Sequence, residues 1–274
     1  MKSILATLPA SLKSLAKVAL QSRPVSIGDS GNAKSRLLIL GNGPSLRTTI
    51  ENQSDYLTSH DSMAVNFAAN TPEFRELRPK YYILMDPVFF SAPGVDSNVD
   101  TLWHNLKAAE WDMTLIVPRR QRRHAEQALN GSVRILTFND IGLEGHPSLT
   151  NLLYRLRLGM PRPRNVLIPA IMCGLWLGYK DIEVFGADHS WMQTLSVTDD
   201  NCVVSVQPHF YSDNEAEKAR VTAVYRDIPL HSIVESFAIA FRGYHSIAGY
   251  ARRIGATITN RTPGSMIDAF PRRK

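Results

Sequence analysis

Asparagine and aspartate side chains follow several apolar runs of this chain, where they could bind a polar ligand. The first lies in the turn Gly41-Asn42-Gly43-Pro44-Ser45, directly after the apolar residues 37–40. Glycines let the backbone turn tightly and approach a ligand, an asparagine amide both donates and accepts hydrogen bonds, and a helix that begins here would point free N–H groups at an anion. The turn therefore predicts a nucleotide site with Gly41, Asn42, Gly43 and Ser45 as ligand contacts, and a purely structural turn is the alternative.

Three further short polar residues, Asn66, Asp86 and Asp188, also follow predicted strands. In open parallel sheets, ligands bind beyond the carboxyl ends of the strands. We therefore expect these residues and Asn42 to lie along one edge of a sheet and to contact the ligand. Because loops favour Asn and Asp in any case, a structural role in a turn is the alternative for each of them.

The elements that must position these residues are short apolar runs separated by helical spacings. This alternation predicts an α/β fold with a Rossmann-like, doubly wound and mainly parallel sheet. Helices are expected over residues 166–178 and 230–254. The predicted strands are residues 37–40, 62–67, 81–87, 114–118, 133–136, 181–188 and 256–260.

A nucleotide-binding domain over residues 36–274 is expected to carry a small lid at about residues 189–220. That segment has no clear periodicity, is rich in His, Trp, Tyr and hydroxyl side chains, and begins at a strand end. Long irregular segments at such a place are typical of functional loops. Residues 23–35 contain Gly, Ser and Pro and indicate a linker between the domain and the N-terminal segment.

The N-terminal segment, residues 1–35 with this linker, is basic and amphipathic. Its leucines at positions 12, 15 and 20 fall near one helical face, while Lys13 and Lys17 lie elsewhere. A signal peptide would need a longer apolar core and a small-residue cleavage site. The segment therefore either lies on an anionic membrane or packs as a helix on the domain's own surface, and both alternatives stay open.

Composition and charge limit the partners. Lys and Arg total 31 against 25 acidic residues, a net charge of +6, which suggests a polyanionic neighbour such as lipid headgroups or nucleic acid. No aromatic residues interleave the basic run at 119–124, so nucleic-acid binding is not expected. The basic N-terminal and C-terminal segments, the latter ending Arg272-Arg273-Lys274, favour a membrane surface. Two cysteines and no run of ~18 apolar residues indicate a protein of the reducing cytoplasm, peripheral at most on a membrane.

Several patches, in order along residues 36–270, resemble the small bacterial sialyltransferases that use CMP-sialic acid. The wider superfamily also contains the motility-associated glycosyltransferases and the archaeal 6-hydroxymethylpterin pyrophosphokinases, so the resemblance leaves the donor open. The patches are Gly41-Asn42-Gly43-Pro44-Ser45-Leu46, Asn66, Asp86-Pro87, Leu177-Gly178-Tyr179-Lys180-Asp181-Ile182, Gly186-Ala187-Asp188 and Pro263-Gly264-Ser265-Met266-Ile267-Asp268-Ala269-Phe270.

The resemblance implies a Rossmann-like nucleotide domain under a small lid, with no metal in the mechanism. It implies that Asn42 and Asn66 hold the nucleotide and its phosphate. Two positions depart from the family. Asp86-Pro87 stands where the family has Asn-Pro, which changes a contact at the sugar or ribose, and Asn165 lies where a Ser-Gly pair contacts the cytidine.

In the family a lid histidine is the catalytic base, and His209 is the candidate here. A sugar hydroxyl that attacks an anomeric carbon must lose a proton, and a near-neutral imidazole can accept it. His189 is the competitor for this role, or a phosphate contact. The lid tyrosines that steady the departing phosphate have no counterpart between Asp188 and Phe210, so His189, Ser190, Trp191 or Thr194 would have to substitute. Tyr211 is a further expected substrate contact.

The sequence thus predicts an inverting, metal-independent glycosyltransferase that moves sialic acid or a related ulosonic acid from a CMP-sugar co-substrate, without another cofactor. Its acceptor would be a lipid-linked or cell-surface glycan at the inner face of the bacterial inner membrane, as in lipopolysaccharide biosynthesis. Two alternatives remain: a Mg²⁺-dependent pyrophosphokinase in which Asp86 and Asp188 hold the metal, and a non-enzymatic nucleotide sensor. The acceptor, the linkage and the choice between a monomer and a homo-oligomer are left open.

Overall fold

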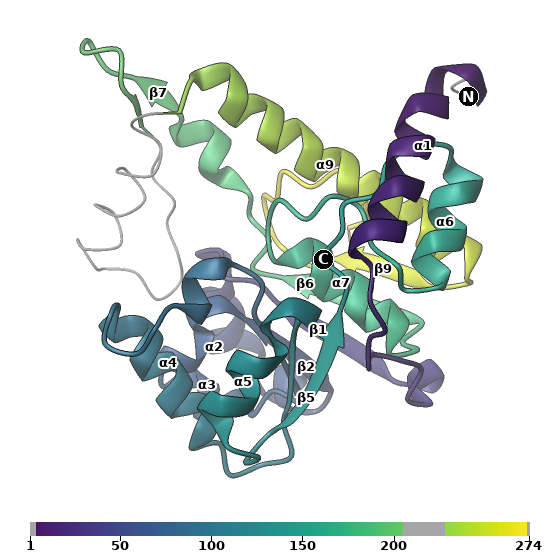
Figure 1. Ribbon diagram of the computed structural model, residues 1–274. Helices are drawn as coiled ribbons and strands as arrows, with labels where there is room; N and C mark the ends of the chain where they lie inside the picture. The colour runs from purple at the N-terminus through teal and green to yellow at the C-terminus, as the bar shows by residue number, and fades with distance from the viewer. Residues whose placement is uncertain (1–3, 205–227, 273–274) are drawn as a thin grey trace.

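In the computed structural model, which describes residues 4–204 and 228–272, seven parallel strands form one sheet with helices on both faces (Figure 1). The strand order is β5-β4-β3-β2-β1-β6-β9. The predicted fold class is therefore confirmed, and each predicted strand is present with shifts of a few residues at its ends. The strands are β1 (Arg36–Leu40), β2 (Asp61–Val65), β3 (Tyr81–Ile83), β4 (Thr114–Pro118), β5 (Arg134–Phe138), β6 (Asp181–Phe185) and β9 (Thr257–Asn260).

The helices cover the sheet because successive strand residues are apolar on both sides. On β1, Leu37 and Ile39 pack toward one layer of helices, while Leu38 and Leu40 pack toward the other, and all four are buried. Parallel sheets covered on both faces need such continuous apolar strands. The first layer contains α6 (Pro147–Arg155), α7 (Leu167–Trp176) and α9 (Leu230–Arg253), and the second contains α2 (Ser45–Thr58), α3 (Glu73–Leu77), α4 (Ser97–Lys107) and α5 (Arg122–Leu129).

The chain reverses its direction of winding between β1 and β6. Strands β1 to β5 follow one another outward across the sheet, and the chain then returns to place β6 on the other side of β1. Such a topological switch point is where open α/β sheets bind ligands. Four short 3-10 helices lie in the connections of this half of the fold, namely η1 (Asn32–Lys34), η2 (Asn66–Asn70), η3 (Pro87–Phe90) and η4 (Arg119–Gln121).

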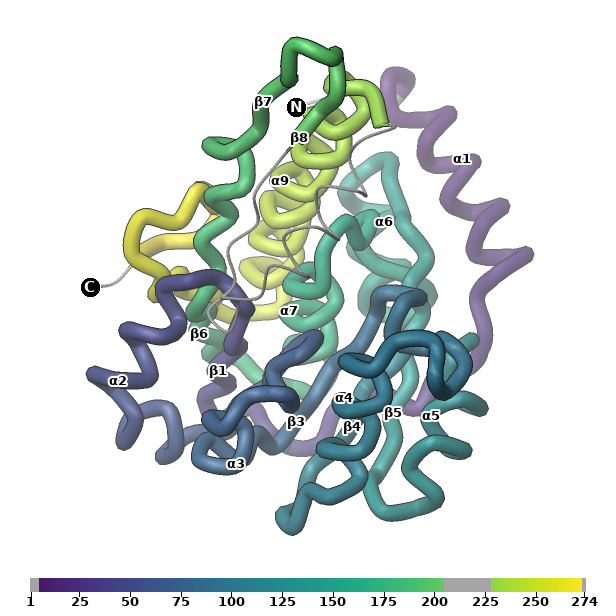
Figure 2. Tube along the Cα trace, turned by 90° about the vertical axis from the view of Figure 1, so that its left-hand side faces the viewer, coloured from purple at the N-terminus to yellow at the C-terminus, as the bar shows by residue number. Residues whose placement is uncertain are grey.

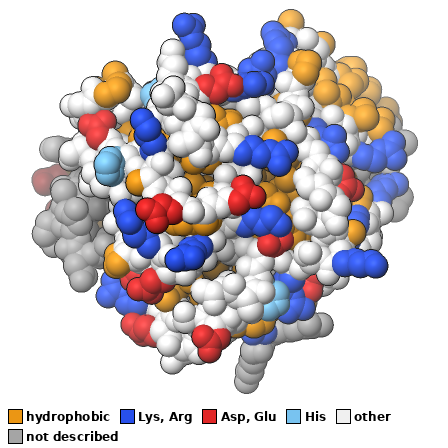
Figure 3. Space-filling view, turned by 90° about the horizontal axis from the view of Figure 1, so that it is seen from below, with side chains coloured by type: hydrophobic (Ala, Val, Ile, Leu, Met, Phe, Trp, Pro, Cys, Tyr) orange, Lys and Arg blue, Asp and Glu red, His pale blue; other side chains and the backbone are white. Residues whose placement is uncertain are grey.

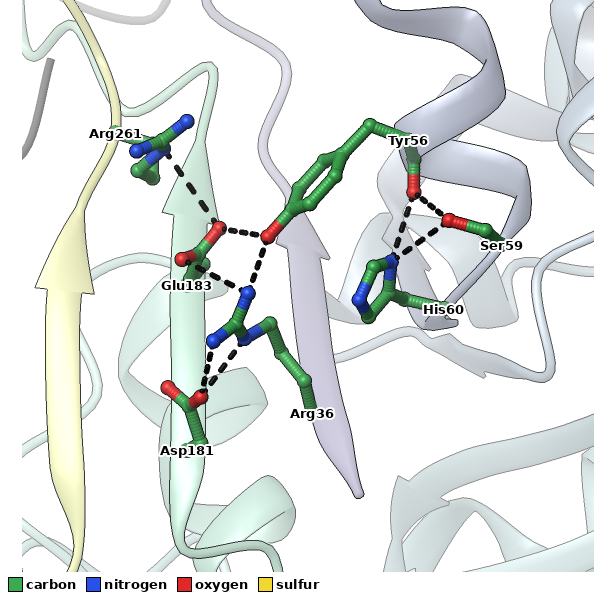
Figure 4. Close-up of polar contacts among 7 residues, drawn as sticks. All are labelled: Arg36, Tyr56, Ser59, His60, Asp181, Glu183 and Arg261. Carbon is green, nitrogen blue, oxygen red and sulfur yellow. Dashed lines mark hydrogen bonds and ion pairs between the residues drawn. The ribbon is translucent and has the colours of Figure 1, made fainter.

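A polar network joins the starts of β1 and β6 to α2 and to the chain after β9 (Figure 4). Arg36 and Asp181 are partners in the strand register and form an ion pair of 2.7 Å. The buried carboxylate of Glu183 accepts a hydrogen bond from the Tyr56 hydroxyl at 2.8 Å, with Arg36 at 3.6 Å and Arg261 at 3.7 Å. Burial, followed by the bond to Glu183, raises the pKa of Tyr56. The network fixes β6 beside β1, and the opposite ends of these strands carry the predicted site.

The residues predicted as a linker are part of the folded unit. The backbone N–H of Ile27 donates to the carbonyl of Thr137 in the edge strand β5 at 3.2 Å, and Ile27 is buried. The Asn139 amide accepts from the N–H of Arg23 at 3.1 Å and donates to the Arg23 carbonyl at 2.9 Å. The linker interpretation is wrong in this respect, because a Gly-, Ser- and Pro-bearing segment can also run extended along a sheet edge, where it covers unpaired backbone groups.

The N-terminal helix α1 (Ile4–Gln21) packs on the domain through small polar residues. Ser14 donates through Oγ to the Glu144 carbonyl at 2.6 Å, and Lys17 donates to the Gly142 carbonyl at 3.0 Å. Thr7, Ser11 and Ser14 are buried, while the leucines of α1 are exposed. None of the described helices is long and apolar enough to cross a membrane.

Candidate functional site

The turns that follow β1 and β6 lie against each other at the switch point. Gly41 donates through its N–H to the Phe185 carbonyl at 2.8 Å, and Gly43 donates to the Gly186 carbonyl at 2.8 Å. A Cβ built on Gly41 would lie 2.5 Å from the Gly186 oxygen, so no larger residue fits there. The glycines predicted to let a ligand approach the backbone therefore serve first to bring two strand ends together.

Asp188 lies at the N-terminus of α2. Its carboxylate accepts hydrogen bonds from the Ser45 N–H at 3.3 Å and from the Ser45 hydroxyl at 2.8 Å. A negative side chain is favourable at this end of a helix, yet burial raises the pKa of Asp188, and the bonds from Ser45 oppose that rise. The expectation that α2 offers free N–H groups to a phosphate needs correction, since Asp188 already occupies this position.

The four strand-end residues predicted to bind the ligand do lie at one edge of the sheet. Asp86, Asn66, Asn42 and Asp188 follow β3, β2, β1 and β6, which are consecutive neighbours in the sheet. Asn42 is buried at 7% exposure, whereas Asp86 is exposed and caps η3 by accepting from the Val88 N–H at 3.0 Å. Asn66 has a φ of 52°, a left-handed conformation that Asn tolerates better than most residues. The edge thus presents a row of short amide and carboxylate side chains.

A second chain of polar contacts runs from His189 into the helical layer. His189 Nε2 lies 2.7 Å from the Tyr244 hydroxyl, which donates to Asn165 Oδ1 at 2.9 Å. Because the single hydroxyl proton goes to Asn165, His189 must donate through Nε2–H, and its Nδ1 is the acceptor nitrogen. Asn165 Oδ1 also accepts from the Leu167 N–H at 3.1 Å at the start of α7. Predicted ligand residues Asn165 and His189 are therefore joined, through Tyr244, to the helix behind the sheet.

The surroundings of His189 keep its ring neutral. The ring lies 4.8 Å from Trp191, 6.0 Å from Phe241 and 5.4 Å from Tyr244, measured between centroids. Burial lowers the pKa of His189 to about 3. A neutral histidine brings no positive charge to a phosphate, so this geometry favours a role in positioning over a charged contact. Tyr244 was not predicted, because a Tyr inside an amphipathic helix has the pattern of any core residue.

The buried neutral histidine predicts a loss of stability in acid. The unfolded chain binds a proton at His189 below pH about 6.5 while the folded chain does not, so the free energy of unfolding falls as pH drops through this range. Between pH 6.5 and about pH 5 we expect a fall of about 2 kcal/mol from this group. Urea unfolding of the wild type and of His189→Gln at both pH values measures it. An equal fall in both proteins would show that His189 is not the group responsible.

The first part of the predicted lid packs on α9 (Figure 2). It consists of the 3-10 helix η5 (Ser190–Thr194) and a small antiparallel hairpin of β7 (Ser196–Val197) and β8 (Val203–Val204). Trp191 and Val203 belong to one apolar cluster with Phe237 of α9. Ser190 is half-buried beside His189. His209 and Tyr211 lie outside the described residues, and within the described ranges no group of three or more His, Cys, Asp and Glu could hold a metal ion.

Comparison with known proteins supports the architecture. No protein-family model and no curated protein matches the sequence. Among solved structures, the fold is similar to that of the MAf glycosyltransferase from Magnetospirillum magneticum AMB-1, with a TM-score of 0.51 and 14% sequence identity. The match covers 98% of this chain and 38% of the other, so this chain spans well under half of that protein. At this identity the likeness shows a shared fold.

Proposed function

We propose that this chain is a glycosyltransferase that moves sialic acid or a related ulosonic acid from a CMP-sugar to a glycan acceptor. The observation that carries the proposal is the row of Asp86, Asn66, Asn42 and Asp188 on four neighbouring strand ends at the switch point. The fold likeness to a MAf glycosyltransferase supports it. The proposed reaction is inverting and independent of metal ions, with no cofactor besides the donor.

Each residue of the row has a proposed role. The amides of Asn42 and Asn66 bind the nucleotide phosphate, and Asp86, which is exposed, binds a hydroxyl of the sugar or ribose. Asp188 and Ser45 hold the turns after β6 and β1 together at the α2 N-terminus. As the phosphate departs it gains negative charge, which fixed amide and hydroxyl donors can stabilise. His209 accepts the proton of the attacking hydroxyl, and one displacement by one base inverts the anomeric centre.

The geometry disfavours the pyrophosphokinase alternative in the form that the sequence suggested. Asp86 and Asp188 follow strands β3 and β6, which are separated by two intervening strands. Three strand spacings of about 4.8 Å place these ends about 14 Å apart, whereas oxygens that share one Mg²⁺ each lie at about 2.1 Å from it. Asp188 moreover accepts two hydrogen bonds from Ser45. The pair is thus poorly placed to hold one metal ion together.

A thermal-shift experiment on the full chain tests the proposed donor. CMP at one hundred times its dissociation constant should stabilise the fold by ~2.7 kcal/mol, and excess EDTA should leave this effect unchanged. Asn66→Gly should weaken it, because glycine keeps the left-handed backbone while the amide is lost. The matched control is Asn130→Gly, a left-handed residue at the end of α5 that lies away from the site. Stabilisation by ATP only, and only with Mg²⁺, would contradict the proposal in favour of the pyrophosphokinase.

A further inference from the structure

The helix α1 presents an unpartnered apolar face to solvent. Leu5, Leu8, Leu12 and Leu15 recur at intervals of three and four residues, and together with Leu20 they are between 43% and 80% exposed. This spacing places the first four on one side of a helix. The opposite side carries the hydroxyl residues that bond the domain. The helix is therefore fixed to the protein through its polar side, with its leucines outward.

The neighbouring helix α6 extends this apolar face. The backbone N–H of His146, the N-cap of α6, donates to Ser11 Oγ of α1 at 3.0 Å, and the two helices lie side by side in both Figure 1 and Figure 2. Leu152 and Leu156 of this region are 42% and 54% exposed. We call α1 and α6 with these exposed leucines the α1–α6 face.

The segments that build the α1–α6 face are basic and almost free of acidic residues. No Asp or Glu precedes Asp29, and none occurs between Glu144 and Asp181. Over the same stretches the chain carries Lys2, Lys13, Lys17 and Arg23, and then Arg155, Arg157, Arg162, Arg164 and Lys180. Figure 3 shows hydrophobic side chains gathered at the upper right edge, the side on which α1 lies, with Lys and Arg side chains next to them. These segments therefore combine exposed leucines with an excess of positive charge, of which Glu144 offsets only part through its ion pair with Arg162 at 3.9 Å.

A groove between the end of α1 and the end of α6 adds a place for an anionic group. It has a volume of about 390 Å³ and is lined by Arg23, Arg157 and the apolar Val18 and Leu156. The Nε of Arg157 is buried and has no hydrogen-bond partner in the structure. The guanidinium groups of Arg23 and Arg157, which both line the groove, are of the kind that binds phosphate oxygens.

We propose that the α1–α6 face binds the surface of an anionic lipid bilayer, with the leucines among the acyl chains and the arginine groove on a headgroup phosphate. An amphipathic helix with leucines on one side and lysines at its flanks is suited to lie in such an interface. Basic residues near an anionic surface add to the affinity. This inference is independent of the transfer reaction, because it involves none of the residues at the sheet edge.

Vesicle flotation with the full chain tests it. The wild type should bind vesicles of phosphatidylglycerol mixed with phosphatidylcholine and should bind phosphatidylcholine alone far more weakly. Leu8→Gln/Leu12→Gln should lower the affinity for the anionic vesicles about 100-fold, and Lys13→Gln/Arg23→Gln should lower it roughly tenfold or more. Leu8, Leu12 and Lys13 are exposed positions of α1, where Gln is a good helix former. Arg23 is exposed just beyond the helix, and its side chain donates to the neighbouring Ser22 carbonyl, so both double variants should stay folded. Val95→Gln, an exposed apolar residue outside this face, is the control.

The competing occupant of the face is a second copy of this chain. Sedimentation of the wild type and of Leu8→Gln/Leu12→Gln without lipid distinguishes the two. A monomer in both cases, together with the vesicle results above, supports the proposal. A dimer that the double substitution dissociates, with no binding of the wild type to anionic vesicles, would overturn it. Equal binding of the wild type and both double variants would overturn it as well. CMP-induced stabilisation, measured in parallel, should be the same in all variants.

Discussion

His209→Ala should lose most of the transfer activity while its affinity for CMP changes little. Removal of a general base lowers a rate by 10²–10⁴-fold, or roughly 3–5 kcal/mol in the barrier. The loss should fall on kcat, because the base acts on the acceptor hydroxyl and does not touch the nucleotide. Release of CMP from CMP-sialic acid measures turnover, and the thermal shift with CMP measures binding.

The control for this variant is His231→Ala, an exposed histidine at the start of α9 with no proposed role. Transfer near the normal rate by His209→Ala would contradict the assignment. The acceptor nitrogen Nδ1 of His189 would then be the next candidate base, although burial lowers the pKa of this ring to about 3 and makes it a weak one. Lost turnover with CMP binding retained would also exclude the non-enzymatic sensor.

The sheet could be predicted from the sequence because its strands are apolar on both faces. Runs such as residues 37–40 have no polar residue that would give them another period, and the glycine turn at 41–43 ends this one. The arrangement of the strand-end residues along one edge followed from the same pattern. Once Asn42, Asn66 and Asp188 are assigned to the carboxyl ends of parallel strands, the geometry of the sheet brings them to one edge.

The partners of the site residues could not be predicted, because they depend on contacts between distant segments. Nothing in the turn at 41–45 indicates that Asp188 will occupy the N-terminus of α2. The contact of His189 with Tyr244 joins residues 55 positions apart, and Tyr244 has only the helical spacing of a core residue. The sequence also did not indicate which side of α1 faces the domain, because the buried side of this helix carries hydroxyl side chains and the leucines are exposed.

The segment at 23–35 shows that composition alone does not separate a flexible linker from an ordered extended segment. Its composition is that of a flexible linker, and the same residue types suit a strap that runs along a sheet edge. Hydrogen bonds to Thr137 and Asn139 decide between the two, and both acceptors lie more than one hundred residues away. Because Arg23, Ser26 and Ile27 bond to Thr137 and Asn139 at the edge of the sheet, deletion of the N-terminal segment would disturb the fold. Point substitutions on the exposed side of α1 are therefore the better test of membrane binding.

Gly43→Ala should both destabilise the protein and abolish its response to CMP. A Cβ on Gly43 would lie 1.9 Å from Asp188 Oδ2 and 2.7 Å from the Gly186 oxygen, so the turns after β1 and β6 must separate. The φ of Gly43 is not positive, so alanine can adopt its backbone conformation. The expected loss of stability therefore comes from the close contacts of the added methyl group. We expect the free energy of unfolding to fall by about 2–4 kcal/mol, from overpacking together with the lost bonds between Ser45 and Asp188.

Urea unfolding measures this fall, and a CMP thermal shift on the folded variant measures binding. Gly249→Ala is the matched control, because its Cβ would meet only a flexible arginine end at 4.0 Å inside α9. There the same substitution should stabilise the helix by roughly 0.5–1 kcal/mol. Separation of the two turns moves Asn42 away from Asp188, so CMP should no longer stabilise Gly43→Ala even where that variant is folded. A Gly43→Ala protein with normal stability and a normal CMP response would show that the two turns are not in contact, and would place the nucleotide site elsewhere on the sheet edge.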